Sequence, residues 1–240
     1  VGSAAQRAER LGADCLALSG NLHDATLGAY AAVQATSKIT VATMGLVCFA
    51  RSPMVTAVAA WDLQAAAEGR FQLGLSSLVA PIMTQKYGVP WAPPAPRMRE
   101  YIAALRAIFD CWQQGVPLNF VGKHYKIRRQ SAYNAPPKLA APEIPVHIGA
   151  IGPRMTELAG EVACGILTHP TNSTPRFVSE RLLPNLHVGL AKANRSADRV
   201  AVVVNPPLAL GSSTEEIRTR RESWRSLLAI LFSTPEYGAS

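Results

Sequence analysis

The chain has 240 residues, of which 48% are hydrophobic and 17% are charged, and no apolar run in it is long enough to predict a membrane-spanning helix. Its four cysteines stand far apart and form no Cys-x-x-Cys pair, which argues against a disulfide framework or a zinc site and favours a cytoplasmic protein. The formal net charge of +8 favours acidic partners, but the basic residues are scattered and accompany no nucleic-acid-binding motif, so neither nucleic acid nor a membrane is an expected partner.

Apolar strand candidates alternate with helical patterns along almost the whole chain, which is typical of a parallel sheet covered by helices. Strands are predicted over residues 14–18, 39–47, 71–75, 144–148, 165–168 and 200–205. Helices are predicted over residues 3–11, 25–35, 53–67, 97–114, 177–193 and 214–231, with another directly after residue 152. We expect a single domain over residues 1–240, in which residues 77–143 form an inserted region of loop, helix and hairpin.

This pattern fits two architectures, a doubly wound sheet and a (β/α)₈ barrel. Six predicted strands are fewer than the eight of a complete barrel. No Gly-x-Gly-x-x-Gly follows the first strand, which argues against a Rossmann dinucleotide domain. In both architectures the chemistry gathers at the carboxyl ends of the strands. The chain also begins with Val1, inside a helical pattern, which suggests that a segment precedes it.

The segment Gly149-Ala150-Ile151-Gly152 follows a predicted strand and leads into a helix that opens with Pro153. Glycine lets the backbone approach a ligand closely, and proline suits the first helical position. The amino end of a helix offers N–H groups and a positive dipole end to an anion. The segment therefore predicts a phosphate-type cradle, although a plain strand-to-helix turn favours the same residues.

Two histidines at predicted strand ends are candidate catalytic residues. His23 stands beside Asp24, and the pair fits an oriented acid–base dyad. The alternative is that Asp24 caps the next helix and His23 is exposed. His169 follows the strand over 165–168, where it fits a hydrogen bond to a cofactor phosphate or the role of an acid, and the alternative is a satisfied structural histidine. Arg51, just past another strand end, fits either an anionic cofactor tail or a salt bridge to a helix.

Four segments, spread over nearly the whole chain, carry a resemblance to a known family. They are Phe49 to Pro53 with Trp61 to Gln64, Gly69 to Leu75, Pro90-Trp91 with Arg97 to Tyr101 and Trp112 to Gly115, and Gly149 to Gly165. With these segments in this order, the chain resembles the luciferase-like monooxygenase superfamily, and most of all its branch that uses the deazaflavin coenzyme F-420.

The resemblance implies an α/β fold, a (β/α)₈ TIM barrel of the bacterial-luciferase type, that lacks its first strand and its last βα unit in this chain. It also implies a deazaflavin or flavin across the carboxyl ends of the strands. The residues that match cofactor-binding segments of the family are Thr43, Met44 and Gly45, then Gly149, Ala150, Ile151 and Gly152, and finally Thr168 and His169.

The implied function is that of an oxidoreductase that moves a hydride to or from a small organic substrate, with coenzyme F-420 as cofactor and a homodimer as the default assembly. One alternative is an FMN-dependent monooxygenase that uses molecular oxygen. A second is a degenerate barrel without catalysis, because Gly20, Val79 and Ile82 stand where relatives carry acidic or polar residues.

Overall fold

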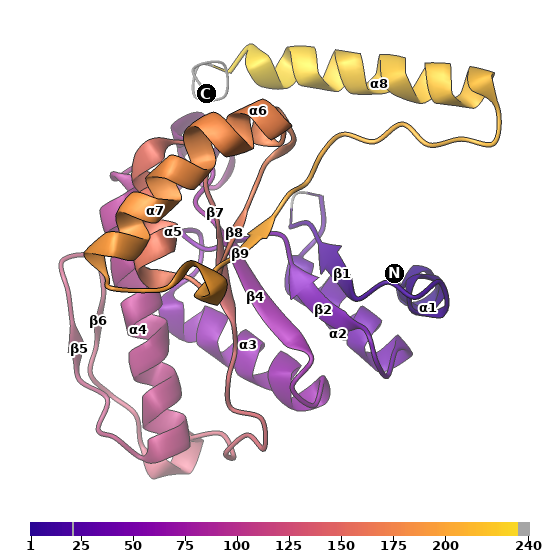
Figure 1. Cartoon of the computed structure of the whole chain (residues 1–240). Helices are drawn as coiled ribbons and strands as arrows, with labels where there is room; N and C mark the ends of the chain where they lie inside the picture. The colour runs from indigo at the N-terminus through magenta and orange to yellow at the C-terminus, as the bar shows by residue number, and fades with distance from the viewer. Residues whose placement is uncertain (21, 235–240) are drawn as a thin grey trace. The chain divides into compact units, whose positions relative to one another are not determined.

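The structure is a computed structural model that describes residues 1–20 and 22–234 (Figure 1). The chain divides into two compact units. The first holds Val1–Ile148 together with Val162–Cys164, and the second holds Gly149–Glu161 and the chain from Gly165 on. Each unit is built around parallel strands, as the alternation of strands and helices predicts.

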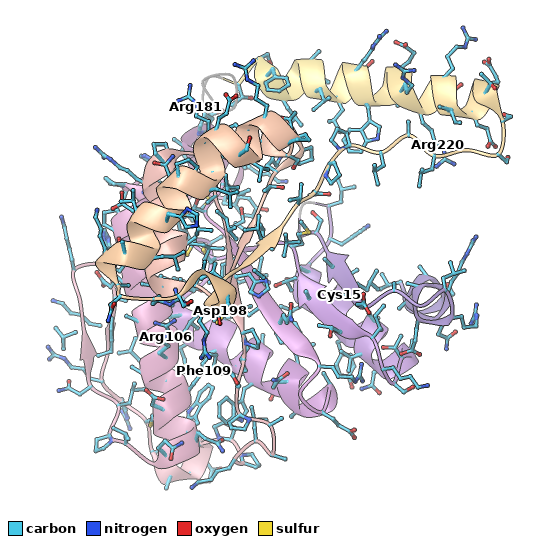
Figure 2. The ribbon with its side chains drawn as sticks, viewed as in Figure 1. Cys15, Arg106, Phe109, Arg181, Asp198 and Arg220 are labelled. Carbon is cyan, nitrogen blue, oxygen red and sulfur yellow. The ribbon has the colours of Figure 1, made fainter. Side chains whose placement is uncertain are left out.

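The first unit contains a parallel sheet in the order β1-β2-β4-β7, and β3 pairs with β4 as well. The strands are β1 (Cys15–Leu18), β2 (Thr40–Thr43), β3 (Leu46–Val47), β4 (Phe71–Ser76) and β7 (Val146–Gly149). The helices are α1 (Gly2–Arg10), α2 (Ala25–Ala35), α3 (Pro53–Ala66) and α4 (Pro94–Gln114), with a π-helical turn η1 (Ile82–Lys86) and a 3-10 turn η2 (Ala132–Asn134). Cys15 lies on β1 and is exposed (Figure 2).

The strand predicted over residues 39–47 is broken into β2 and β3. The break falls at Met44 and Gly45, which are joined by a cis peptide bond. A Cβ on Gly45 would lie 3.0 Å from the carbonyl carbon of Leu75 and 3.1 Å from its oxygen. The chain therefore runs so close to β4 at this point that glycine is the residue that fits.

The core of the first unit lies between the sheet, α3 and α4 (Figure 1). Tyr101, Leu105 and Ile108 recur at helical spacing on α4, and all three are fully buried. Trp112, one turn further, meets Trp61 of α3 edge to face, with ring centroids 5.2 Å apart. Phe109 lies 5.7 Å from the same Trp61 ring (Figure 2). This aromatic contact joins the two helices.

A short antiparallel hairpin, β5 (Phe120–Val121) with β6 (Lys126–Ile127), is held to α4 by one carboxylate. Glu100 accepts hydrogen bonds from three consecutive backbone amides, at 3.0 Å from Lys123, 2.7 Å from His124 and 2.6 Å from Tyr125. Arg97 adds a bond from its Nε to the Tyr125 hydroxyl, at 2.9 Å. The hairpin is thus fixed to α4 by charge-assisted bonds.

The second unit pairs β8 (Gly165–Leu167) with β9 (Ala201–Val203) in parallel. Its helices are α5 (Pro153–Val162), α6 (Pro175–Phe177), α7 (Leu183–Lys192) and α8 (Thr214–Phe232), with the turns η3 (Pro170–Asn172), η4 (Val178–Leu182) and η5 (Ala197–Arg199). After α7, Arg195 donates from Nη1 to the carbonyl of Gly160 on α5, at 2.6 Å.

The helix predicted over residues 177–193 is present as a continuous helical run that contains a π-helical turn. It begins with α6, widens into the π-helical turn η4, and continues as α7. Pro184 follows the widened turn, and it has no N–H to donate one turn back. The helix predicted over 214–231 agrees with α8, which buries none of its residues. Within the described residues, none of the helices is long and apolar enough to cross a membrane.

Replacing Glu100 with alanine removes the acceptor of three backbone amides. We expect the Glu100→Ala variant to lose about 2 kcal/mol of unfolding free energy, since hydrogen bonds to charged groups stabilise more than neutral ones. Hydrogen exchange at the amides of residues 123–125 should accelerate. Glu180→Ala is the matched control, because its ion pair with Arg176 is exposed and is expected to contribute about 0.5 kcal/mol or less. Unchanged exchange in the Glu100 variant would contradict the role assigned to this carboxylate.

Candidate functional site

The predicted dyad lies in the first unit, at the carboxyl end of β1. Asp24 is the N-cap of α2, where its carboxylate accepts from the backbone N–H of Thr26 at 2.8 Å and from the Thr26 hydroxyl at 2.5 Å. It also forms an ion pair with Arg51. His23 is exposed. This arrangement matches the helix-cap alternative for Asp24 and the salt-bridge alternative for Arg51.

The surroundings of Asp24 stabilise its charged form. Partial burial by itself raises the pKa of this carboxyl. The hydrogen bonds from Thr26 and the charge of Arg51 outweigh that effect, so the pKa of Asp24 lies below its ordinary range. Asp24 is therefore a carboxylate at neutral pH, committed to a helix end and a guanidinium.

The segment Thr43–Gly45 lies beside this loop in the same unit. The buried hydroxyl of Thr43 donates to the carbonyl of Gly74 at 2.8 Å and accepts from its N–H at 2.9 Å, which ties β2 to β4. The Met44 N–H donates to the carbonyl of Leu18, at the end of β1, at 2.7 Å. A Cβ on Gly20 would lie 3.2 Å from the carbonyl oxygen of Gly45. The structure thus brings the ends of β1 and β2 together. The side chain of Thr43 links two strands of the sheet.

The predicted cradle opens the second unit. The Ala150 N–H donates to the carbonyl of Leu167, at the end of β8, at 3.2 Å. Gly152 is exposed and directly precedes α5, and a Cβ placed on it would meet no described atom within 4 Å. Its carbonyl accepts from the Thr156 N–H at 3.1 Å, so the amides of Arg154 and Met155 precede the first bond within the helix. The space beside Gly152 suits the approach of a ligand.

The segment that begins at Thr168 lies against the cradle through one buried side chain. The Asn172 side chain donates from Nδ2 to the carbonyl of Ala150 at 3.0 Å, and its Oδ1 accepts from the His169 N–H at 2.6 Å. The Thr168 hydroxyl lies 2.6 Å from that of Ser173 and accepts from the Asn205 N–H at 2.9 Å. Within the second unit, hydrogen bonds through Asn172 therefore connect the predicted cofactor segment at Ala150 with the one at His169.

His169 is partly buried in this turn. Its Nδ1 lies 2.9 Å from the hydroxyl of Thr171 and accepts from the Thr171 N–H at 3.4 Å. Burial lowers the pKa of the His169 imidazole below its ordinary value, because the low-dielectric surroundings disfavour the charged form. At neutral pH the side chain is therefore an uncharged hydrogen-bonding group.

Sequence reasoning assigned no individual role to Thr171, Asn172 and Ser173, which are all buried and complete the hydrogen bonds of the turn. A run of hydroxyl and amide residues directly after an apolar strand is the signal that could have found them. Among the described residues no group of three His, Cys, Asp or Glu side chains could hold a metal ion. Two surface grooves, one lined by Arg220 and Trp224 and one by Trp61 and Trp112, include none of the predicted site residues.

Comparison with known proteins places the sequence in a family. The sequence model of the family described as luciferase-like monooxygenase matches residues 1–237. An uncharacterized protein of Mycobacterium tuberculosis is 38% identical over 215 residues, which are 90% of this chain and 63% of that protein. The F420-dependent glucose-6-phosphate dehydrogenase of Microbacterium testaceum is 28% identical over 159 residues, 66% of this chain and 45% of the dehydrogenase. The chain thus spans less than two thirds of the length of these relatives.

The fold agrees with a solved structure of the same kind. The coenzyme F420-dependent tetrahydromethanopterin reductase of Methanopyrus kandleri superposes with a TM-score of 0.70 at 23% identity, over 84% of this chain and 61% of the reductase. This likeness confirms the predicted fold class, the α/β barrel of the luciferase type. With residues 1–237 matched by the family model, the chain belongs to the luciferase-like monooxygenase family.

Proposed function

We propose that the protein is an oxidoreductase that binds coenzyme F-420 at the carboxyl ends of its strands and transfers a hydride to or from a small organic substrate. The observation that carries the proposal is the junction in the second unit, where Asn172 ties the cradle residue Ala150 to the turn of His169. The F420-dependent dehydrogenase among the relatives supports the choice of cofactor.

The residues present fit such a cofactor. The space beside Gly152, at the amino end of α5, suits a phosphate or another anionic group. The imidazole of His169, which lies beside the Thr171 hydroxyl, suits an oxygen atom of the cofactor. When bound, a deazaflavin supplies the hydride chemistry, and the protein supplies binding, orientation and electrostatics.

The first alternative is an FMN-dependent monooxygenase, and the name of the family favours it. Reduced deazaflavin does not readily activate oxygen, whereas reduced FMN does. Oxygen uptake in the presence of an FMN reductase therefore separates the two functions.

The second alternative is a barrel that binds a ligand without turnover. Val79 and Ile82, in the segment after β4, are half-buried apolar side chains and offer no proton. A side chain on Gly20 would crowd the Gly45 carbonyl. Retained cofactor binding without hydride transfer to any donor would favour this alternative.

Gly152→Asp tests the cradle. A fluorescence titration with coenzyme F-420 and, separately, with FMN should show tight binding of the deazaflavin by the unmodified protein. The aspartate should weaken that binding at least about tenfold, because it repels an anionic group and fills its space. Gly152→Asn is the matched control of nearly equal size, and it separates charge from volume. Both variants should fold normally, since a Cβ at this position meets open space. Equal affinity of all three proteins would refute the cradle.

Substitutions of Asp24 test whether the pair of His23 and Asp24 takes part in catalysis. Asparagine is also a good N-cap, so Asp24→Asn should keep the end of α2 and lose only the ion pair with Arg51, at a cost of about 1 kcal/mol or less. Asp24→Ala should lose the cap as well and cost about 1–2 kcal/mol. A stable asparagine variant that binds cofactor but transfers no hydride would establish catalysis by Asp24. Full activity would leave it as a cap.

The contribution of Asp24 to stability should depend on pH. Because folding lowers the pKa of this carboxyl, the contribution is present above the unfolded-state pKa and is lost as the pH falls through the lower folded-state pKa. Urea unfolding of the unmodified protein and of Asp24→Ala should therefore differ most at neutral pH, and the difference should shrink in acid. A difference that grows in acid would contradict the sign of this pKa shift.

A further inference from the structure

The turn after β8 determines which nitrogen of His169 carries its proton. Two groups of Thr171 point at Nδ1, the backbone N–H at 3.4 Å and the side-chain hydroxyl at 2.9 Å. A backbone N–H can only donate, which favours Nδ1 as the unprotonated nitrogen, but a bond of 3.4 Å is weak, so the shorter contact with the hydroxyl is needed to hold this state. The hydroxyl can donate to the same lone pair. In the neutral imidazole the proton then resides on Nε2.

We propose that Thr171 is a positioning residue that fixes His169 as the Nε2–H tautomer, so that the imidazole acts as a hydrogen-bond donor to an oxygen of the bound cofactor. The part of this inference that concerns the ligand rests on the proposed function. The matching ligand atom is an acceptor, such as a carbonyl or phosphoryl oxygen.

The surroundings of His169 keep this arrangement in place. Thr171 is 8% exposed, Asn172 is fully buried and Ser173 is 5% exposed. Asn172 and Ser173 hold the backbone of His169 from both sides, because Asn172 Oδ1 accepts from its N–H and the Ser173 hydroxyl donates to its carbonyl at 2.7 Å. The ring is therefore attached to a turn whose polar groups are already satisfied.

Protonation of the ring would work against the same contact. An imidazolium carries a hydrogen on both nitrogens, and the one on Nδ1 would face the Thr171 N–H. This is consistent with the lowered pKa of His169, which burial causes. A neutral Nε2–H is a good donor but a very weak acid. His169 thus orients an oxygen atom, and the acid role predicted for it from the sequence would need the charged ring.

The tautomer can be read without a cofactor, in the full chain labelled with ¹⁵N at histidine. Long-range ¹H–¹⁵N spectra near neutral pH should show His169 protonated at Nε2, with Nδ1 unprotonated. Thr171→Val keeps the shape of the side chain and the backbone N–H but removes the hydroxyl, so the Nδ1–H tautomer should become populated. Thr171→Ser restores the hydroxyl and should restore the spectrum. Thr174→Val is the control, because Thr174 caps α6 with its hydroxyl.

Cofactor binding supplies the second measurement. Titration with coenzyme F-420 should show about fivefold weaker binding for Thr171→Val and unmodified binding for Thr171→Ser and Thr174→Val. An Nδ1–H tautomer in the unmodified protein would overturn the inference. So would a valine variant whose tautomer and affinity both stay unchanged. If the expected tautomer shift occurs but neither F-420 nor FMN binds, the proposed function fails while the role of Thr171 in setting the tautomer stands.

Discussion

A buried polar side chain must find a hydrogen-bond partner, and in this protein that requirement holds the ends of the strands. In the first unit, the hydroxyl of Thr43 bridges to both backbone groups of Gly74 on the neighbouring strand. In the second, Asn172 spans from the turn of His169 to the carbonyl of Ala150. The polar side-chain atoms of Thr43 and Asn172 thus form hydrogen bonds with backbone groups. Thr43 and Asn172 therefore hold the strand ends in place, and we expect other groups beside them to contact a ligand.

The side chain of Asp24 is likewise engaged in contacts that stabilise the fold. A carboxylate after a strand and beside a histidine fits an acid–base dyad equally well before its partners are known. In the folded chain it accepts from Thr26 and pairs with Arg51, and both contacts favour the charged form. A carboxylate in this state is a poor proton donor at neutral pH. Catalysis by Asp24 would thus require the His23 ring or a substrate to displace one of these partners.

Much of the fold could be predicted because it depends on local periodicity. The buried stripe of Tyr101, Leu105 and Ile108 was visible as helical spacing, and the helix over 25–35 agrees with α2. The break at Met44 and Gly45 was not visible in the periodicity, and only the family resemblance pointed to this segment, since the break involves the close approach of Leu75, which is distant in sequence. The role of Asn172 was missed for the same reason, because its partner Ala150 lies 22 positions away in the chain. Long-range contacts leave no periodic signal in a single sequence.

The chemistry of the described strand ends favours a function that depends on a cofactor. In the second unit these ends present hydroxyls, amides and an imidazole that burial keeps neutral. In the first, the charged pair of Asp24 and Arg51 is committed to the start of α2. The imidazole is suited to orient an oxygen atom while the other groups hold the strand ends in place, and none of them is a strong acid, base or nucleophile as placed here. Reaction at such a site would draw its reactivity from a bound group, which is the division of labour that hydride transfer by a deazaflavin or flavin requires.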